Sequence, residues 1–139
     1  MRFSYQASAS DGSWEVNTLP NIPATFINPQ NGREITVFPL VDSGAAFTVI
    51  NRQVAEALGI DIASGARLEC FGMGGTFYAC EHRLLVKIIG SKDTIPLICG
   101  VTRDLETDSV LGQEGFFDHY KVIFEKYNNT FEIILRRRF

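Results

Sequence analysis

Short apolar runs, separated by turn-forming residues, make up most of the sequence after residue 14. Such runs, rich in β-branched and aromatic residues and bounded by Gly, Pro, Asn or Asp, are typical of β-strands. We therefore expect strands at residues 24–27, 35–41, 67–71, 76–80, 84–89, 94–99, 121–125 and 130–135. The hairpins recur at fairly regular spacing, which predicts a mainly β protein, either a closed barrel or a sandwich.

One segment has the pattern of a helix. Asn51 can accept a hydrogen bond from the first turn, and Gly59 suits a left-handed C-terminal end. The apolar stripe between them consists of Val54, Ala55 and Leu58. A second short helix is predicted near residues 114–120. The pattern therefore predicts a mainly β fold with two short helices.

Length and charge narrow the class of protein. At 139 residues the chain is expected to form one domain, residues 1–139, with a loosely held segment at residues 1–13. A net charge of −3 argues against a nucleic-acid partner, because phosphate binding requires a basic face. No apolar stretch reaches about 18 residues, so we expect no membrane span. The N-terminus has no apolar signal core, so secretion is not predicted.

The three cysteines indicate neither a metal site nor a disulfide framework. Cys70, Cys80 and Cys99 form no CxxC pattern and no spacing typical of a metal site. Their odd number also argues against a complete disulfide framework. We interpret them as reduced thiols in a cytoplasmic protein, and we expect neither a metal nor another cofactor.

A candidate catalytic residue lies where an apolar strand ends and a turn begins. Asp42 follows an apolar pair and precedes the apolar run at residues 47–50. A carboxylate so closely flanked by apolar residues is partly desolvated. Gly44 lets a substrate or another chain approach the backbone closely, and Ser43 can hydrogen bond to the loop. Asp-Ser-Gly is a common tripeptide, so by itself it favours the simpler interpretation of an aspartate that only begins a turn.

Three segments, taken in order, resemble the retropepsin-like aspartic peptidases. The first is the active-site loop, formed here by Asp42, Ser43, Gly44 and Ala45. The second resembles the glycine-rich flap over the substrate and consists of Gly72, Met73, Gly74, Gly75 and Thr76. The third resembles the hydrophobic-hydrophobic-Gly element and consists of Val110, Leu111 and Gly112. The resemblance spans about residues 22–135 and is strongest to bacterial single-domain members and to the peptidase domain of DNA-damage-inducible ubiquitin-shuttle proteins.

This resemblance implies a fold and a mechanism. The fold is a closed acid-protease barrel, active as a two-fold homodimer. Asp42 is the implied catalytic residue, and the single Asp-Ser-Gly of the chain means that a second subunit must supply the other carboxylate. The pair would activate a water that hydrolyses a peptide bond in a peptide or an unfolded protein. Ser43 would hold the two loops together across the axis.

One position departs from the retroviral members of this family. Ala46 lies two residues after the motif glycine, where retroviral enzymes carry an Asp that binds the substrate backbone. Substrate contacts of those enzymes therefore do not transfer to this chain. The predicted C-terminal hairpin also exceeds their single terminal strand, so the sheet between subunits is expected to differ.

Other enzyme classes fit the sequence poorly. Ser43 is not part of a Gly-x-Ser-x-Gly motif, and no helix follows the glycines at residues 72–75, as a dinucleotide site would require. The two histidines, His82 and His119, are expected at the surface or at strand ends. The alternative that stays open is a dimeric peptide- or protein-binding module that has the same fold but no catalytic activity.

Overall fold

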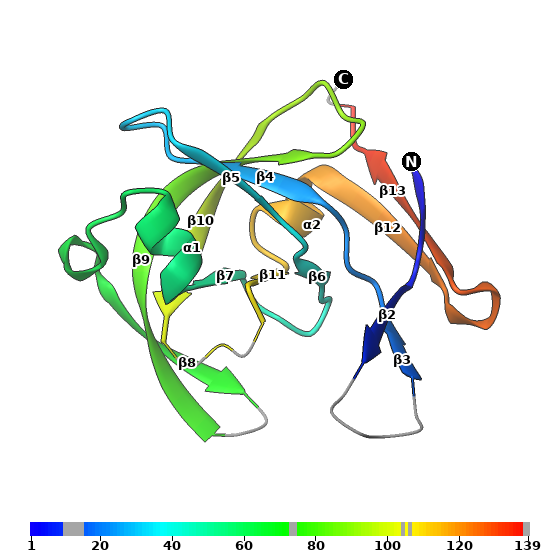
Figure 1. Ribbon diagram of the computed structural model, residues 1–139, viewed down its shortest axis with the longest axis horizontal. Helices are drawn as coiled ribbons and strands as arrows, with labels where there is room; N and C mark the ends of the chain where they lie inside the picture. Colours follow the sequence, from blue (N-terminus) through cyan, green and yellow to red (C-terminus); the bar gives the residue numbers. More distant parts are fainter. Residues whose placement is uncertain (10–15, 73–74, 104, 106, 138–139) are drawn as a thin grey trace.

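The computed structural model describes the chain except for residues 10–15, 73–74, 104, 106 and 138–139 (Figure 1). The strands are β1 (Arg2–Ser4), β2 (Gln6–Ala9), β3 (Val16–Leu19), β4 (Ala24–Ile27), β5 (Glu34–Val37), β6 (Leu40–Val41), β7 (Thr48–Asn51), β8 (Arg67–Gly72), β9 (Gly75–Ile88), β10 (Ile95–Thr102), β11 (Ser109–Leu111), β12 (Tyr120–Glu125) and β13 (Thr130–Leu135). The α-helices are α1 (Arg52–Ala57) and α2 (Phe116–His119), and the 3-10 helices are η1 (Ile62–Ser64) and η2 (Lys126–Asn128). Among the described residues, none of these helices has the length and apolarity needed to cross a membrane. The prediction of a mainly β protein with two short helices is confirmed.

One curled sheet forms the body of the molecule. Its strands pair in the order β5-β4-β9-β10-β7-β11-β6, and β8 pairs with β9 beside this path. The β10–β7 and β11–β6 pairs are parallel, and the other pairs of this sheet are antiparallel. The sheet curls into a half-barrel, as Figure 1 shows. Closure into the expected barrel stays a prediction.

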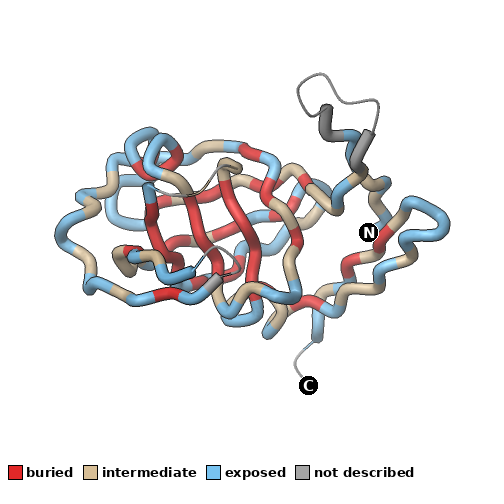
Figure 2. The backbone as a smooth tube through the Cα atoms, turned by 90° about the horizontal axis from the view of Figure 1, so that it is seen from below, coloured by how far each residue is buried: buried red, intermediate tan, exposed pale blue. Residues whose placement is uncertain are grey.

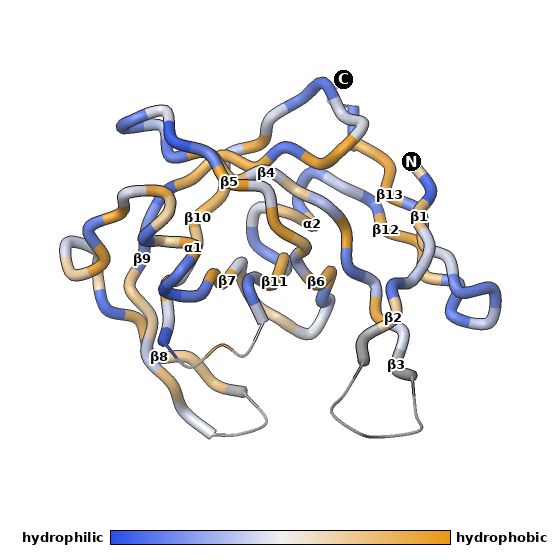
Figure 3. Tube along the Cα trace, viewed as in Figure 1, coloured by the Kyte–Doolittle hydropathy of each residue, from blue (hydrophilic) through white to orange (hydrophobic). Residues whose placement is uncertain are grey.

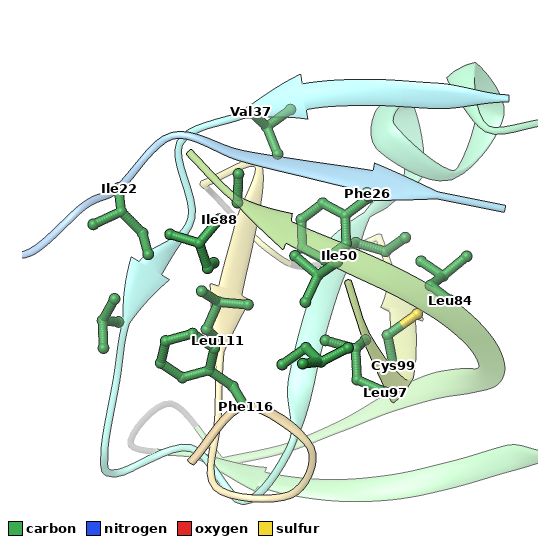
Figure 4. Close-up of a cluster of buried hydrophobic side chains, with 14 of the residues drawn as sticks. Ile22, Phe26, Val37, Ile50, Leu84, Ile88, Leu97, Cys99, Leu111 and Phe116 are labelled. Carbon is green, nitrogen blue, oxygen red and sulfur yellow. The ribbon is translucent and has the colours of Figure 1, made fainter. Parts of the chain in front are cut away.

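The core is built from alternating positions of this sheet. In β4, buried Ala24 and Phe26 alternate with half-buried Thr25 and Ile27. Figure 2 shows buried positions concentrated in the sheet, and Figure 3 shows hydrophilic residues at the outer turns. Side chains from β4, β7, β9, β10 and β11 converge on one apolar cluster (Figure 4). Burying one large aliphatic or aromatic side chain contributes about 1.5–3 kcal/mol, so this cluster fixes the strands that carry the candidate site.

Helix α1 has the caps that the sequence predicts. The side-chain oxygen of Asn51 accepts a hydrogen bond from Val54 N at 2.9 Å. Gly59 has a φ angle of 66°, a left-handed conformation that favours glycine after a helix. The predicted apolar stripe is buried against the core, with relative exposures of 0–3% at Val54, Ala55 and Leu58. The helix prediction is therefore confirmed.

Several elements have different boundaries from those predicted; strand β10, for example, extends to Thr102, three residues beyond the expected end at residue 99. The expected strand at residues 35–41 is divided at Pro39 into β5 and β6, because proline cannot donate to a strand ladder. The expected strands at residues 76–80 and 84–89 are one long strand, β9. The polar residues between them stay in the ladder because β9 pairs with β10 there. Helix α2 is shorter than predicted because Tyr120 already begins β12.

The N-terminal segment contains two short strands, β1 and β2. Strand β1 pairs with β13 at the other end of the chain, and the ring of Phe3 stacks on that of Phe131 with centroids 5.6 Å apart. Strands β2 and β3 form a separate two-stranded sheet. Of the segment expected to be loosely held, the structure describes residues 1–9, whereas residues 10–13 lie outside the described residues. How loosely residues 1–13 are held stays a prediction. A partner about 130 positions away leaves no local pattern from which it could be predicted.

Candidate active site

The loop that begins at Asp42 connects β6 with β7. Asp42 is half-buried, and its backbone N–H donates to Leu111 O at 3.0 Å. Within the loop, Asp42 Oδ1 accepts a hydrogen bond from Gly44 N at 2.8 Å, and Asp42 O accepts one from Ala45 N at 3.2 Å. The carboxylate is therefore held at the start of a tight turn, next to strand β11.

Strand β11 lies between the two strands that carry this loop. Val110 and Leu111 pair in parallel with β6, and Ser109 and Val110 pair in antiparallel with β7. All three residues of β11 are buried. A strand that is paired on both sides and covered on both faces favours apolar residues, which explains this part of the motif. The structure thus brings the predicted hydrophobic-hydrophobic-Gly element next to the Asp42 loop.

Gly112 allows the backbones of these two segments to approach closely. A Cβ atom at this position would contact the carbonyl oxygen of Phe47 and would lie 2.8 Å from Ala45 O. Both atoms belong to the backbone, so they cannot rotate away as a flexible side chain would. Gly112 N also lies 3.4 Å from the hydroxyl of Thr48, a fully buried residue. Glycine at position 112 is therefore a requirement of the packing.

The residues after Gly112 make further hydrogen bonds to the loop. Gln113 N donates to Ala45 O at 2.8 Å, and the side-chain amide of Gln113 donates to Ser43 O at 2.6 Å. Glu114 N donates to the carbonyl of the next loop residue, Ala46, at 2.8 Å. Ser43 and Gln113 are 70 positions apart in the sequence, so the loop is shaped by a distant segment.

Two of the residues that shape the loop were not identified from the sequence. Thr48 lies in an apolar run, and a threonine there is typical of any strand. Gln113 is exposed, and a glutamine after a glycine is common on protein surfaces. The one signal that could have marked Gln113 is its position directly after the Val110-Leu111-Gly112 element.

The other side of the loop is open to solvent. Ser43 and Gly44 are exposed, whereas Ala45 is half-buried. The small size of Gly44 keeps room beside the carboxylate, because a Cβ atom there would lie 3.2 Å from Asp42 Oδ1. A carboxylate that is fixed from one side and accessible from the other can accept a proton from a water or share one with a second acid.

The candidate flap lies on a separate hairpin. Strands β8 and β9 pair up to Gly72 opposite Gly75, and Gly75 has a φ angle of 108° that favours glycine. Thr76 is exposed. Met73 and Gly74, which we also expect in the flap, lie outside the described residues. Figure 1 shows this hairpin extending beyond the body of the sheet.

The sequence matches a known family over most of these elements. A family model described as aspartyl protease matches residues 22–114. This range contains the Asp42 loop, the β8–β9 hairpin and strand β11. No curated protein matches the chain.

Two solved structures show the same fold. One is a retropepsin-like aspartic protease from Rickettsia conorii, with a TM-score of 0.60 and 17% identity over 96% of this chain and 90% of that chain. The other is the retroviral protease-like domain of Ddi1 from Leishmania major, with a TM-score of 0.54 and 22% identity over 86% of this chain and 88% of that chain. The half-barrel described above is therefore a retropepsin-like fold, and with the match over residues 22–114 the chain belongs to the aspartyl protease family.

Proposed function

We propose that this chain is an aspartic endopeptidase that acts as a two-fold homodimer, with residues 1–139 forming its single domain. The observation that carries the proposal is the geometry of the Asp42 loop. The strands on either side of this loop pair with β11, and the loop is exposed at Ser43 and Gly44. The chain contains one such loop, whereas this chemistry uses two carboxylates about 3 Å apart. A second copy of the chain would supply the other carboxylate at the two-fold axis.

The two Asp42 carboxylates would share one proton, because like charges so close together cannot both be ionised. The ionised carboxylate would take a proton from a water, and the resulting nucleophile would attack the carbonyl carbon of the peptide bond. The protonated carboxylic acid would donate its proton to the carbonyl oxygen. Collapse of the tetrahedral intermediate would then break the C–N bond, with a proton passing to the leaving nitrogen. General acid–base catalysis of this kind contributes roughly 10²–10⁴-fold to a rate.

The remaining site residues support this assignment. Ser43 is exposed, so its hydroxyl is available to the second subunit, as the family resemblance implies. The β8–β9 hairpin, including Gly72 and Gly75, would cover a peptide bound in an extended conformation. The substrates would then be peptides or unfolded proteins, in which a scissile bond is free to extend. Water and the two carboxylates suffice for this mechanism, without a cofactor.

Asp42→Asn tests the catalytic role, because it keeps the size of the side chain and removes its acid–base chemistry. Asp61→Asn is the matched control, since Asp61 is exposed and its side chain does not cap η1. We expect the parent and the control to cleave an unfolded protein at mildly acidic pH, and Asp42→Asn to be at least about a hundredfold slower. Equal cleavage by Asp42→Asn and the parent would remove Asp42 from the mechanism. Cleavage by neither would favour the binding module.

Sedimentation tests the dimer independently of catalysis. We expect the active species to sediment with twice the mass of the chain and specific activity to fall on dilution below the dissociation constant. A chain that sediments as a monomer and retains its specific activity would refute the two-subunit site.

A further inference from the structure

The side chain of Gln113 contacts the Asp42 loop at one defined peptide. Its amide nitrogen lies 2.6 Å from Ser43 O, and because a carbonyl oxygen only accepts hydrogen bonds, the amide must be the donor. The residue is exposed, so packing of its side chain in the core does not account for this position. The hydrogen bond itself therefore orients the side chain.

The same peptide also contacts the carboxylate. Ser43 O and Gly44 N belong to one planar peptide unit, and in its trans form the C=O and N–H groups point in opposite directions. Gly44 N donates to Asp42 Oδ1 at 2.8 Å. Gln113 and Asp42 thus bind the two ends of a single peptide, and the orientation of one end fixes that of the other.

This peptide needs such a restraint more than its neighbours do. Glycine at position 44 tolerates a wide range of backbone angles, so the Ser43–Gly44 peptide can rotate at low cost. The neighbouring hydrogen bonds, Ala45 N to Asp42 O and Gln113 N to Ala45 O, hold other peptide units. Among the described residues, the Gln113 side chain is the hydrogen-bond donor to Ser43 O. Rotation of this peptide would turn Gly44 N–H away from the carboxylate.

We propose that Gln113 is a positioning residue, which fixes the Ser43–Gly44 peptide and thereby the hydrogen bond from Gly44 N to the Asp42 carboxylate. The donation to Ser43 O also polarises the peptide, and hydrogen bonds in such a chain strengthen one another. The role rests on the proposed function, because it matters for catalysis only if Asp42 is the catalytic residue. Gln113 acts through the loop, and its expected influence is on the rate of the chemical step.

Variants with and without a hydrogen-bond donor at position 113 distinguish this positioning role from simple packing. Gln113→Met keeps the approximate length of the side chain and removes the donor, and Gln113→Glu does so at a pH at which its carboxyl group is ionised, whereas Gln113→Arg provides a donor again. Gln30→Glu is the matched control, because Gln30 is also exposed and lies in the β4–β5 turn. We expect kcat to fall about tenfold or more in the Met and Glu variants, KM to stay within about twofold, and the Arg variant to recover to within about threefold of the parent. An Arg variant as slow as the Met variant, or a Met variant as fast as the parent, overturns the proposal.

A spectroscopic readout keeps the test independent of activity. In 15N-labelled protein, the amide proton of Gly44 should move upfield in Gln113→Met, because its hydrogen bond to the carboxylate weakens, and should not move in Gln30→Glu. An unchanged Gly44 signal in Gln113→Met overturns the positioning role, whether or not the parent cleaves peptides. If instead the signal moves while the parent is inactive, the positioning role stands and the proposed function fails.

Discussion

Replacing Gly112 with alanine tests how the candidate site is assembled. The added Cβ atom would contact the carbonyl oxygen of Phe47 and lie 2.8 Å from Ala45 O, both of them backbone atoms. Relief of this contact requires that the segment after β11 and the Asp42 loop move apart. Their separation would weaken the backbone hydrogen bonds from Gln113 and Glu114 to the loop, both 2.8 Å long.

The expected loss of stability in Gly112→Ala follows from these contacts. Overpacking of a well-packed region costs about 1–3 kcal/mol. Each hydrogen bond contributes about 0.5–1.5 kcal/mol net, so the loss of the two backbone bonds adds about 1–3 kcal/mol. We expect Gly112→Ala to lower the free energy of unfolding by about 2–6 kcal/mol, a large part of the stability of a typical domain, which is about 5–15 kcal/mol.

Urea unfolding measures this loss, with Gly32→Ala as the control. Gly32 has a φ angle of 73° and no atom within 4 Å of a Cβ placed there, so its replacement costs only the backbone strain of about 1–2 kcal/mol. Both variants must be compared at one protein concentration, because dimerisation would contribute to the apparent stability. A Gly112→Ala variant that is as stable as Gly32→Ala would refute the close-packing argument.

Three further outcomes follow from individual side chains. Asn51→Ala should lower the free energy of unfolding by about 1–2 kcal/mol, because it removes both the cap on Val54 N and the hydrogen bond that the Asn51 amide donates to Thr107 O; urea unfolding measures this loss. Burial raises the pKa of Cys99 from 9.0 to about 12, so the unfolded chain loses this proton first, and stability should fall as the pH rises from 9.0 towards about 12. Unfolding of Cys99→Ala should depend less on pH over this range than unfolding of the parent. In the native protein, an alkylating reagent should modify half-buried Cys80 well before Cys99, as peptide mass spectrometry would show.

Elements defined by local patterns could be predicted from the sequence. The strands expected at residues 24–27 and 130–135 coincide with β4 and β13. Turn residues bound the first run on both sides, whereas two asparagines precede the second run and three arginines follow it. The cap of α1 could be predicted because Asn51 bonds to a residue only three positions away. Strand β9 was expected as two strands because polar residues interrupt its apolar pattern. These polar residues are extended because they pair with β10, and a local sequence pattern does not show that pairing.

The candidate site could be predicted only in part, for the same reason. Asp42, Ser43 and Gly44 form a contiguous motif that the family resemblance identifies. That resemblance also identified Gly112 as part of a motif, but it gave no distances between this motif and the loop. The hydrogen bond from Gln113 to Ser43 joins residues 70 positions apart and involves a side chain of ordinary surface type. Such a contact follows from the pairing of β11 with β6 and β7, and it becomes visible only when that pairing is known.

Two hydrogen bonds that shape the loop lie within a single chain. Leu111 O accepts from Asp42 N, and the Gln113 amide donates to Ser43 O. We expect these bonds to hold the loop in one folded subunit, so that a second subunit would add a carboxylate and a shared proton without being needed to form the loop. Dilution below the dissociation constant should therefore abolish cleavage while the Gly44 amide signal of the parent keeps its narrow line and its hydrogen-bonded shift. If that signal broadens as the dimer dissociates, the loop depends on the partner and does not form in a single subunit.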